Sequence, residues 1–138
     1  KARHIYSFGY SHSGYSAKQF TFRMVRMGFG VELIDYAIGL KEYTSIISED
    51  DALVIFSISG GAQVNSPVND LQYFDHSHKP NIIVFTMTSP SPAEKYADIV
   101  IHLPCVSRMA PDMIIDDAPV FFIAIELLLE AMAEGHNT

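Results

Sequence analysis

Serine, threonine and glycine residues gather in three short stretches of this sequence, each following a run of apolar or β-prone residues. The stretches are 9–14 (GYSHSG), 57–62 (SISGGA) and 86–91 (TMTSPS), and none contains a carboxylate, a lysine or an arginine. Hydroxyl groups rotate to donate hydrogen bonds to an anion, and glycine lets a ligand approach the backbone closely. Where such stretches lead into helices, unpaired backbone N–H groups add further donors. The composition of these loops therefore indicates a site for a phosphate or a similar anion.

The same residue types also form ordinary turns and helix caps after strands, so each stretch alone has a purely structural interpretation. The chemical interpretation requires that the three stretches lie at one edge of the fold. In open parallel α/β sheets, ligands bind outside the carboxyl ends of the strands, near the point where the strand order reverses. The elements that surround the three stretches therefore decide between the two interpretations.

Strands and helices alternate along the chain. The run 52–56 (ALVIF) is continuously apolar, as expected for a strand that is buried on both faces of a parallel sheet. Apolar residues at helical spacing between Ala17 and Met27 predict a helix with Ser13 as its N-cap and Gly28 at its end. The full prediction comprises strands over 4–8, 31–34, 52–56, 81–85 and 98–103, further helices over 36–47, 66–76 and 119–133, a helical turn at 91–92 and an irregular stretch over 104–118. This order predicts a three-layer α/β/α sandwich with a five-stranded parallel sheet.

Length, charge and cysteine content narrow the class of protein. The chain has 138 residues, which fits one compact domain over residues 1–138, and its net charge of -7 disfavours direct contact with nucleic acid. Cys105 is the single cysteine, so no internal disulfide can form and a cytoplasmic setting is expected. The longest apolar run, 118–125, is too short to span a bilayer, and no membrane contact is expected. Because the chain begins without methionine, we expect a piece of a longer protein.

Three patterns in this sequence resemble, in order, those of the sugar isomerase (SIS) domain family. They are a strand, a loop with Ser13 and Gly14 and a helix ending in 26–28 (RMG); a buried strand followed by S-x-S-G-x-T, here 57–62; and a strand ending at Thr86, followed by Ser91-Pro92 and Ala97-Asp98. The resemblance covers nearly the whole chain. It implies a five-stranded parallel sheet of flavodoxin-like order between helices, and a binding site for phosphosugars.

Within this family, the segments 20–28 and 122–132 resemble the effector domain of RpiR-type transcription regulators. Those regulators carry a helix-turn-helix domain before the SIS domain, so the resemblance implies a DNA-binding segment upstream of Lys1. It also implies that the domain binds a phosphorylated sugar or related small metabolite, forms homodimers or homotetramers, and does not itself contact nucleic acid. No cofactor is implied.

The resemblance also implies which residues contact the ligand. Ser57 and Ser59 match the phosphate-contacting side chains, with the Gly60 backbone beside them, and Ser13 is a third candidate side chain. Further candidates in the same loops are Ser11, His12, Gly61, Thr86 and Ser91. Two departures bear on this site. Ala62 stands where the family usually has threonine, and Ser66-Pro67 predicts a late start for the next helix. We therefore expect a weaker or re-tuned anion site.

Two other functions stay open beside a phosphosugar-sensing regulatory domain, which is the leading hypothesis. A phosphosugar isomerase needs a base and often an acid, usually glutamate or histidine, and no pattern in the sequence marks such a catalytic pair. A domain kept only for dimerisation is favoured by Ala62. We expect no metal site, because His76, His78 and Asp75 do not complete a ligand set at a familiar spacing.

Overall fold

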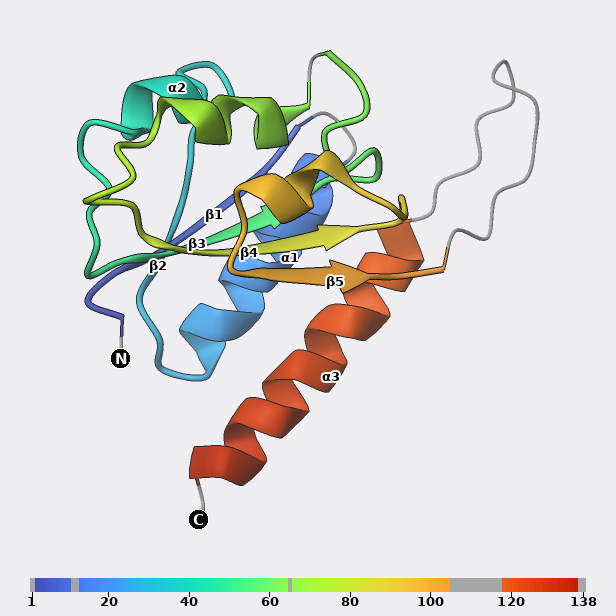
Figure 1. Cartoon of the computed structure of the whole chain (residues 1–138). Helices are drawn as coiled ribbons and strands as arrows, with labels where there is room; N and C mark the ends of the chain where they lie inside the picture. The colour runs from blue at the N-terminus through green and yellow to red at the C-terminus, as the bar shows by residue number, and fades with distance from the viewer. Residues whose placement is uncertain (1, 11–12, 65, 105–117, 137–138) are drawn as a thin grey trace.

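The computed structural model describes residues 2–10, 13–64, 66–104 and 118–136. Its centre is one sheet of five strands in the order β2-β1-β3-β4-β5, and every neighbouring pair is parallel (Figure 1). The strands are β1 (Ile5–Gly9), β2 (Val31–Leu33), β3 (Ala52–Phe56), β4 (Asn81–Thr86) and β5 (Ile99–His102). The fold class predicted from the sequence is confirmed. Because the chain passes from β1 out to β2 and then back to β3, the strand order reverses between β1 and β3.

Two helices, α1 (Ser13–Arg26) and α3 (Ala118–His136), cover one face of the sheet (Figure 1). Helix α3 presents Phe121, Ile125 and Leu129 at one-turn intervals, and all three are buried. They join a cluster to which α1 and the strands contribute Ala17, Phe20, Met24, Val54, Phe56 and Phe85. The helices also contact each other through an ion pair, in which Arg23 Nε lies 2.7 Å from Glu126 Oε1. Helix α3 begins one residue before the predicted start and runs three residues beyond the predicted end.

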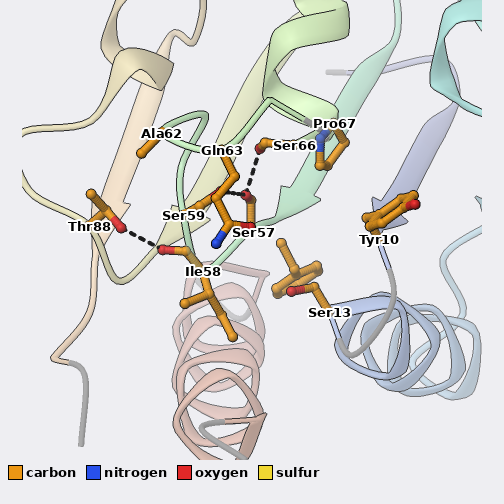
Figure 2. A pocket seen from close by; sticks show the side chains of 11 residues that line it. Tyr10, Ser13, Ser57, Ile58, Ser59, Ala62, Gln63, Ser66, Pro67 and Thr88 are labelled. Carbon is orange, nitrogen blue, oxygen red and sulfur yellow. Dashed lines mark hydrogen bonds between the residues drawn. The ribbon is translucent and has the colours of Figure 1, made fainter. Parts of the chain in front are cut away.

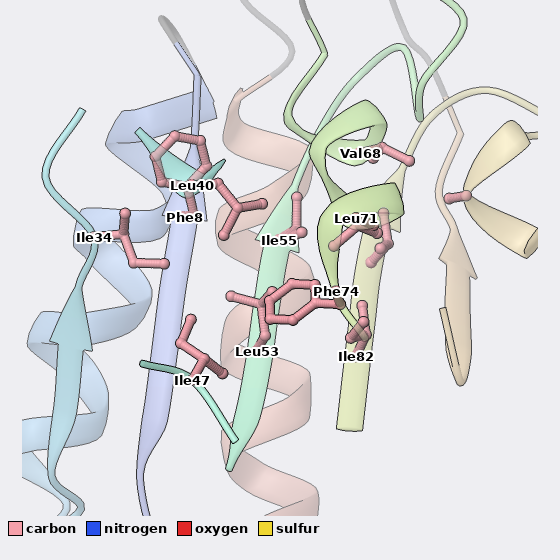
Figure 3. Close-up of a cluster of buried hydrophobic side chains, with 12 residues drawn as sticks. Phe8, Ile34, Leu40, Ile47, Leu53, Ile55, Val68, Leu71, Phe74 and Ile82 are labelled. Atoms are coloured by element: carbon pink, nitrogen blue, oxygen red, sulfur yellow. The ribbon is translucent and has the colours of Figure 1, made fainter. Parts of the chain in front are cut away.

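Three short helices cover the opposite face: α2 (Leu40–Tyr43) and the 3₁₀ helices η1 (Pro67–Tyr73) and η2 (Pro92–Lys95). Figure 3 shows Leu53 and Ile55 of β3 on this face, together with Leu71 and Phe74 from the η1 segment. The other residues of β3, Val54 and Phe56, belong to the cluster on the α1–α3 face. Strand β3 is therefore buried on both faces, which explains its uninterrupted apolar sequence.

Two predicted helices are shorter than expected. Only Leu40–Tyr43 of the stretch 36–47 is helical, because the Asp35 side chain and carbonyl accept the N–H groups of Ala37 and Gly39 and close a turn instead. The stretch 66–76 forms a 3₁₀ helix that ends at Tyr73. There the Asn69 side chain donates to the carbonyls of Gln63 and Val64. Side chains that bond the nearby backbone compete with the α-helical pattern, and apolar spacing does not reveal them.

The structure also bears on the remaining sequence predictions. Most of the predicted irregular stretch, including Cys105, lies outside the described residues. Among the helices that the structure describes, none combines the length and the apolar character needed to cross a bilayer.

Candidate ligand-binding site

A pocket of about 590 Å³ opens at the carboxyl ends of β1 and β3, beside the reversal in strand order (Figure 2). The lining residues come from the ends and following loops of β1, β3 and β4: Tyr10, Ser13, Phe56, Ser57, Ile58, Ser59, Ala62, Gln63, Ser66, Pro67 and Thr88. Its volume lies within the range of about 300–1,000 Å³ that is usual for small-molecule sites. The position and size therefore both fit a small ligand.

Three serine hydroxyls meet in the loop between β3 and η1. The Oγ of Ser57 lies 3.0 Å from that of Ser66 and 3.5 Å from that of Ser59. Ser57 Oγ also accepts the N–H of Gly60 at 3.1 Å, and Ser66 Oγ accepts the N–H of Val68 at 3.3 Å. Because these two oxygens already accept from the backbone, their own hydroxyl protons remain as donors. One proton satisfies the bond between Ser57 and Ser66, which leaves the other and that of Ser59 to donate to a ligand.

Gly60 is held in place from the third predicted loop. Its φ of 58° lies in the left-handed region, and a Cβ at this position would collide with the hydroxyls of Ser91 and Thr86. Its carbonyl accepts the Ser91 hydroxyl at 2.6 Å and the Ala93 N–H at 3.1 Å. The buried hydroxyls of Ser91 and Thr86 therefore fix the backbone beneath the pocket, and neither residue lines it.

The carbonyl of Ile58 joins the loops after β3 and β4. It accepts the hydroxyl of Thr88 at 2.8 Å, the hydroxyl of Thr86 at 3.2 Å and the N–H of Met87 at 3.3 Å. Thr88 lies at the pocket wall and Thr86 is fully buried. This shared acceptor holds Thr88 against the loop that carries the serines.

A tight turn brings the start of α1 to the same edge of the sheet. The Ser13 N–H donates to the Tyr10 carbonyl at 3.1 Å, and a Cβ on Gly9 would collide with the Ser13 carbonyl. Only glycine at position 9 lets the chain turn this closely, and the turn places both Tyr10 and Ser13 in the lining. Ser11 and His12 lie outside the described residues.

The described residues of the lining carry no charged side chain and no histidine. An acid–base pair does lie nearby: His102 of β5 places Nδ1 3.1 Å from the Thr88 carbonyl and Nε2 3.1 Å from Glu94 Oε1. At the opposite end of the lining, a hydrogen bond with Tyr10 raises the pKa of the Tyr36 hydroxyl above its ordinary value. Within the described part of the chain, no cluster of histidine, cysteine and carboxylate side chains suits a metal ion.

Residues 1–131 match the SIS domain family. The chain belongs to this family. Because the match covers nearly the entire sequence, the resemblance inferred from the three loop patterns is confirmed. No curated protein matches the chain with significance.

Solved structures share the fold of this SIS domain. The sugar isomerase domain of the RpiR transcription factor from Sphaerobacter thermophilus superimposes with a TM-score of 0.73 at 16% identity, over 96% of this chain and 70% of that one. The NanR protein of Vibrio vulnificus, complexed with ManNAc-6P, superimposes with a TM-score of 0.82 at 14% identity, over 99% of this chain and 50% of that one. A protein of E. coli CFT073 in complex with a phosphosugar gives 0.73 at 17% identity, with coverage of 96% and 70%. At such identities the likeness shows the fold alone.

The structure separates the predicted site residues of the SIS domain into two groups. Ser13, Ser57 and Ser59 line one pocket, whereas Gly60, Gly61, Thr86 and Ser91 lie outside its lining. Sequence reasoning did not assign Tyr10, Gln63, Ser66 or Thr88 to the site. Ser66 was recognised only as a helix cap, and it does cap η1, yet its hydroxyl also contacts that of Ser57. A search for hydroxyl residues at both ends of the β3–η1 loop would have found it.

Proposed function

We propose that this SIS domain binds a phosphorylated sugar and is the effector-sensing domain of an RpiR-type transcription regulator. The observation that carries the proposal is the meeting of the Ser57, Ser59 and Ser66 hydroxyls in an uncharged pocket at the carboxyl edge of a parallel sheet. Two structural relatives in complex with phosphosugars, one of them ManNAc-6P, and an RpiR relative support the ligand class and the regulatory role.

In this proposal the phosphate lies against the three serines and the sugar extends into the rest of the pocket. Hydroxyl donors can replace lysine or arginine, since each hydrogen bond to a charged group contributes about 1.5–3 kcal/mol. The pocket of about 590 Å³ has room beyond a phosphate group, and Gln63 and Thr88 offer polar groups for sugar hydroxyls. Ala62 presents a methyl group to this pocket, where the family pattern usually has a hydroxyl.

The regulatory role also requires self-association and an attached DNA-binding domain, which we place upstream of Lys1. Helices α1 and α3 leave Phe22, Val25, Ile123 and Leu127 more than half exposed, and the Arg23–Glu126 ion pair joins the two helices. We propose that this apolar face packs against a second copy of the chain in a homodimer or homotetramer. Ligand binding at the neighbouring sheet edge would then alter the geometry of that assembly and of the DNA-binding domains.

A phosphosugar isomerase is the second candidate function. The observation that favours it is the contact between Glu94 and His102, because His102 also reaches the carbonyl of Thr88 at the pocket wall. Glutamate and histidine can transfer the proton that moves between adjacent carbons in an aldose–ketose conversion.

Calorimetric titration of the purified domain with a panel of hexose, pentose and amino-sugar phosphates that includes ManNAc-6P, with inorganic phosphate in parallel, tests the proposal. Binding of a sugar phosphate without conversion to its isomer is the expected result. Conversion of a bound aldose or ketose phosphate, lost in Glu94→Gln, would identify the isomerase instead. Absence of binding across the panel would contradict both functions and leave a dimerisation module.

A further inference from the structure

Two tyrosine side chains form an aromatic pair at the mouth of the pocket. The rings of Tyr10 and Tyr36 have their centroids 5.1 Å apart and are tilted by 42°. Tyr10 follows β1 and Tyr36 follows β2, so both lie at the carboxyl edge where the serines lie. Both remain accessible, with exposed fractions of 43% for Tyr10 and 57% for Tyr36. An exposed aromatic pair beside a small-molecule pocket offers surface that neither the core nor the phosphate cradle uses.

The arrangement of the lining separates this pair from the phosphate donors. In Figure 2, Tyr10 and Thr88 lie toward opposite ends of the lining, with Ser57 and Ser59 between them. The Tyr10 ring stands beyond Ser13 and Pro67 on the side toward β2. A ligand whose phosphate lies against the serines can therefore extend its uncharged part toward the aromatic pair.

We propose that Tyr10 and Tyr36 form the wall that packs against the sugar ring and determine which phosphorylated ligand the pocket accepts. This inference rests on the proposed function. An aromatic face is electron-rich, and the C–H groups on one side of a pyranose or furanose ring carry the opposite partial charge. The mutual contact of the two tyrosines limits their side-chain freedom, so a ligand that packs on them loses little additional entropy.

The proposed role of the wall differs from that of the serines in a measurable way. Removal of an aromatic contact weakens binding by about 0.5–1.5 kcal/mol beyond area burial, which corresponds to a loss of about two- to tenfold in affinity. The loss must appear only for ligands that have a sugar ring. Inorganic phosphate contacts the serine cradle alone and must be insensitive to both tyrosines.

The test compares Tyr10→Ala, Tyr36→Ala and Tyr10→Phe with the unaltered domain in calorimetric titrations against ManNAc-6P, a pentose phosphate and inorganic phosphate. Tyr15→Ala is the matched control, because Tyr15 is 66% exposed on α1 and does not line the pocket. We expect the two alanine variants to weaken sugar phosphate binding by about two- to tenfold, Tyr10→Phe to retain most of it, and inorganic phosphate binding to stay unchanged throughout.

Three outcomes would overturn the inference. Unchanged sugar phosphate affinity in both alanine variants would show that the ring lies elsewhere, while the proposed function would stand. Equal losses for sugar phosphate and inorganic phosphate would show that the tyrosines act on the cradle and not on the sugar. Absence of sugar phosphate binding by the unaltered domain would contradict the proposed function, and this inference with it.

Discussion

Replacement of Ser57 by alanine separates the structural from the chemical interpretation of the hydroxyl-rich loops. The Ser57 hydroxyl is buried, accepts the Gly60 N–H and contacts the Ser66 hydroxyl, so Ser57→Ala removes the centre of the proposed cradle. If these serines only build the turn, the variant loses stability and no ligand affinity. If they hold a phosphate, the loss of affinity must exceed the loss of stability.

The structure allows both losses to be estimated. Without the Ser57 hydroxyl, the Gly60 N–H keeps the Ser57 carbonyl at 3.2 Å, and the Ser66 hydroxyl keeps the Val68 N–H at 3.3 Å. No buried polar group is left unpaired, so the free energy of unfolding should fall by only about 1 kcal/mol, which corresponds to about 3–5 °C in Tm for a domain of this size. Loss of a hydrogen bond to a charged phosphate should weaken binding by about ten- to a hundredfold.

Calorimetric titration gives the affinity, and thermal unfolding with and without saturating ligand gives the stability. Ser45→Ala is the control, since Ser45 is exposed, bonds only the Glu42 carbonyl and lies far from the pocket lining. We expect the ligand-induced rise in Tm to shrink in Ser57→Ala and to persist in Ser45→Ala. Sugar phosphate affinity that is unchanged in a folded Ser57→Ala would refute the cradle and leave Ser57 with a turn-forming role.

Three further predictions follow from the same structure. Gly60→Ala should lower the free energy of unfolding by about 2–4 kcal/mol in denaturant titrations, because φ is 58° and the methyl group meets Ser91 and Thr86, whereas Gly30→Ala, with open space around it, should have little effect; equal effects would contradict this. Phosphate affinity should vary by less than about threefold between low and high salt, since the described lining holds no lysine or arginine and the chain carries a net charge of -7; a steep loss with salt would point to a cation at the site. The hydrogen bond from Arg23 lowers the pKa of Glu126, so this pair stabilises the fold above about pH 4.5 and the effect is lost as the pH falls through the lowered pKa; Glu126→Gln should therefore flatten the acid limb of the stability profile, and an unaltered limb would exclude the pair.

The sheet could be predicted because burial constrains every residue of its central strands. Leu53 and Ile55 face one layer of helices while Val54 and Phe56 face the other, so the sequence has no polar position to spare. The intervals between such strands then specify crossovers through helices. The short helices were harder to predict, because bonds from Asp35 and Asn69 to nearby backbone groups decide their lengths, and such bonds have no periodicity.

The site was predictable where a residue contributes through its position after a strand, as Ser13, Ser57 and Ser59 do. Tyr10 was not, because a tyrosine after a strand is compatible with packing against the sheet, and only the contact with Tyr36 across two loops shows an exposed aromatic pair. Thr88 and Gln63 were missed for a similar reason. Each lies in a loop that was identified, but at a residue whose direction depends on bonds to another loop.

The β3–η1 loop shows how a spatial substitution can escape a linear pattern. The family pattern counts five residues from Ser57 and finds Ala62, which lacks a hydroxyl, and the late helix start at Ser66-Pro67 predicts that helix N–H groups lie too far away. Ser66 does cap η1, and its oxygen accepts the Val68 N–H that would otherwise be available to an anion. Yet the same oxygen lies 3.0 Å from Ser57, so the loop returns a hydroxyl to the cradle from nine residues along the chain. On our proposal, the late start of η1 therefore replaces one donor by another. Ser66→Ala should then weaken phosphate binding as Ser57→Ala does, and affinity that survives its loss would mean that the cradle requires only Ser57 and Ser59.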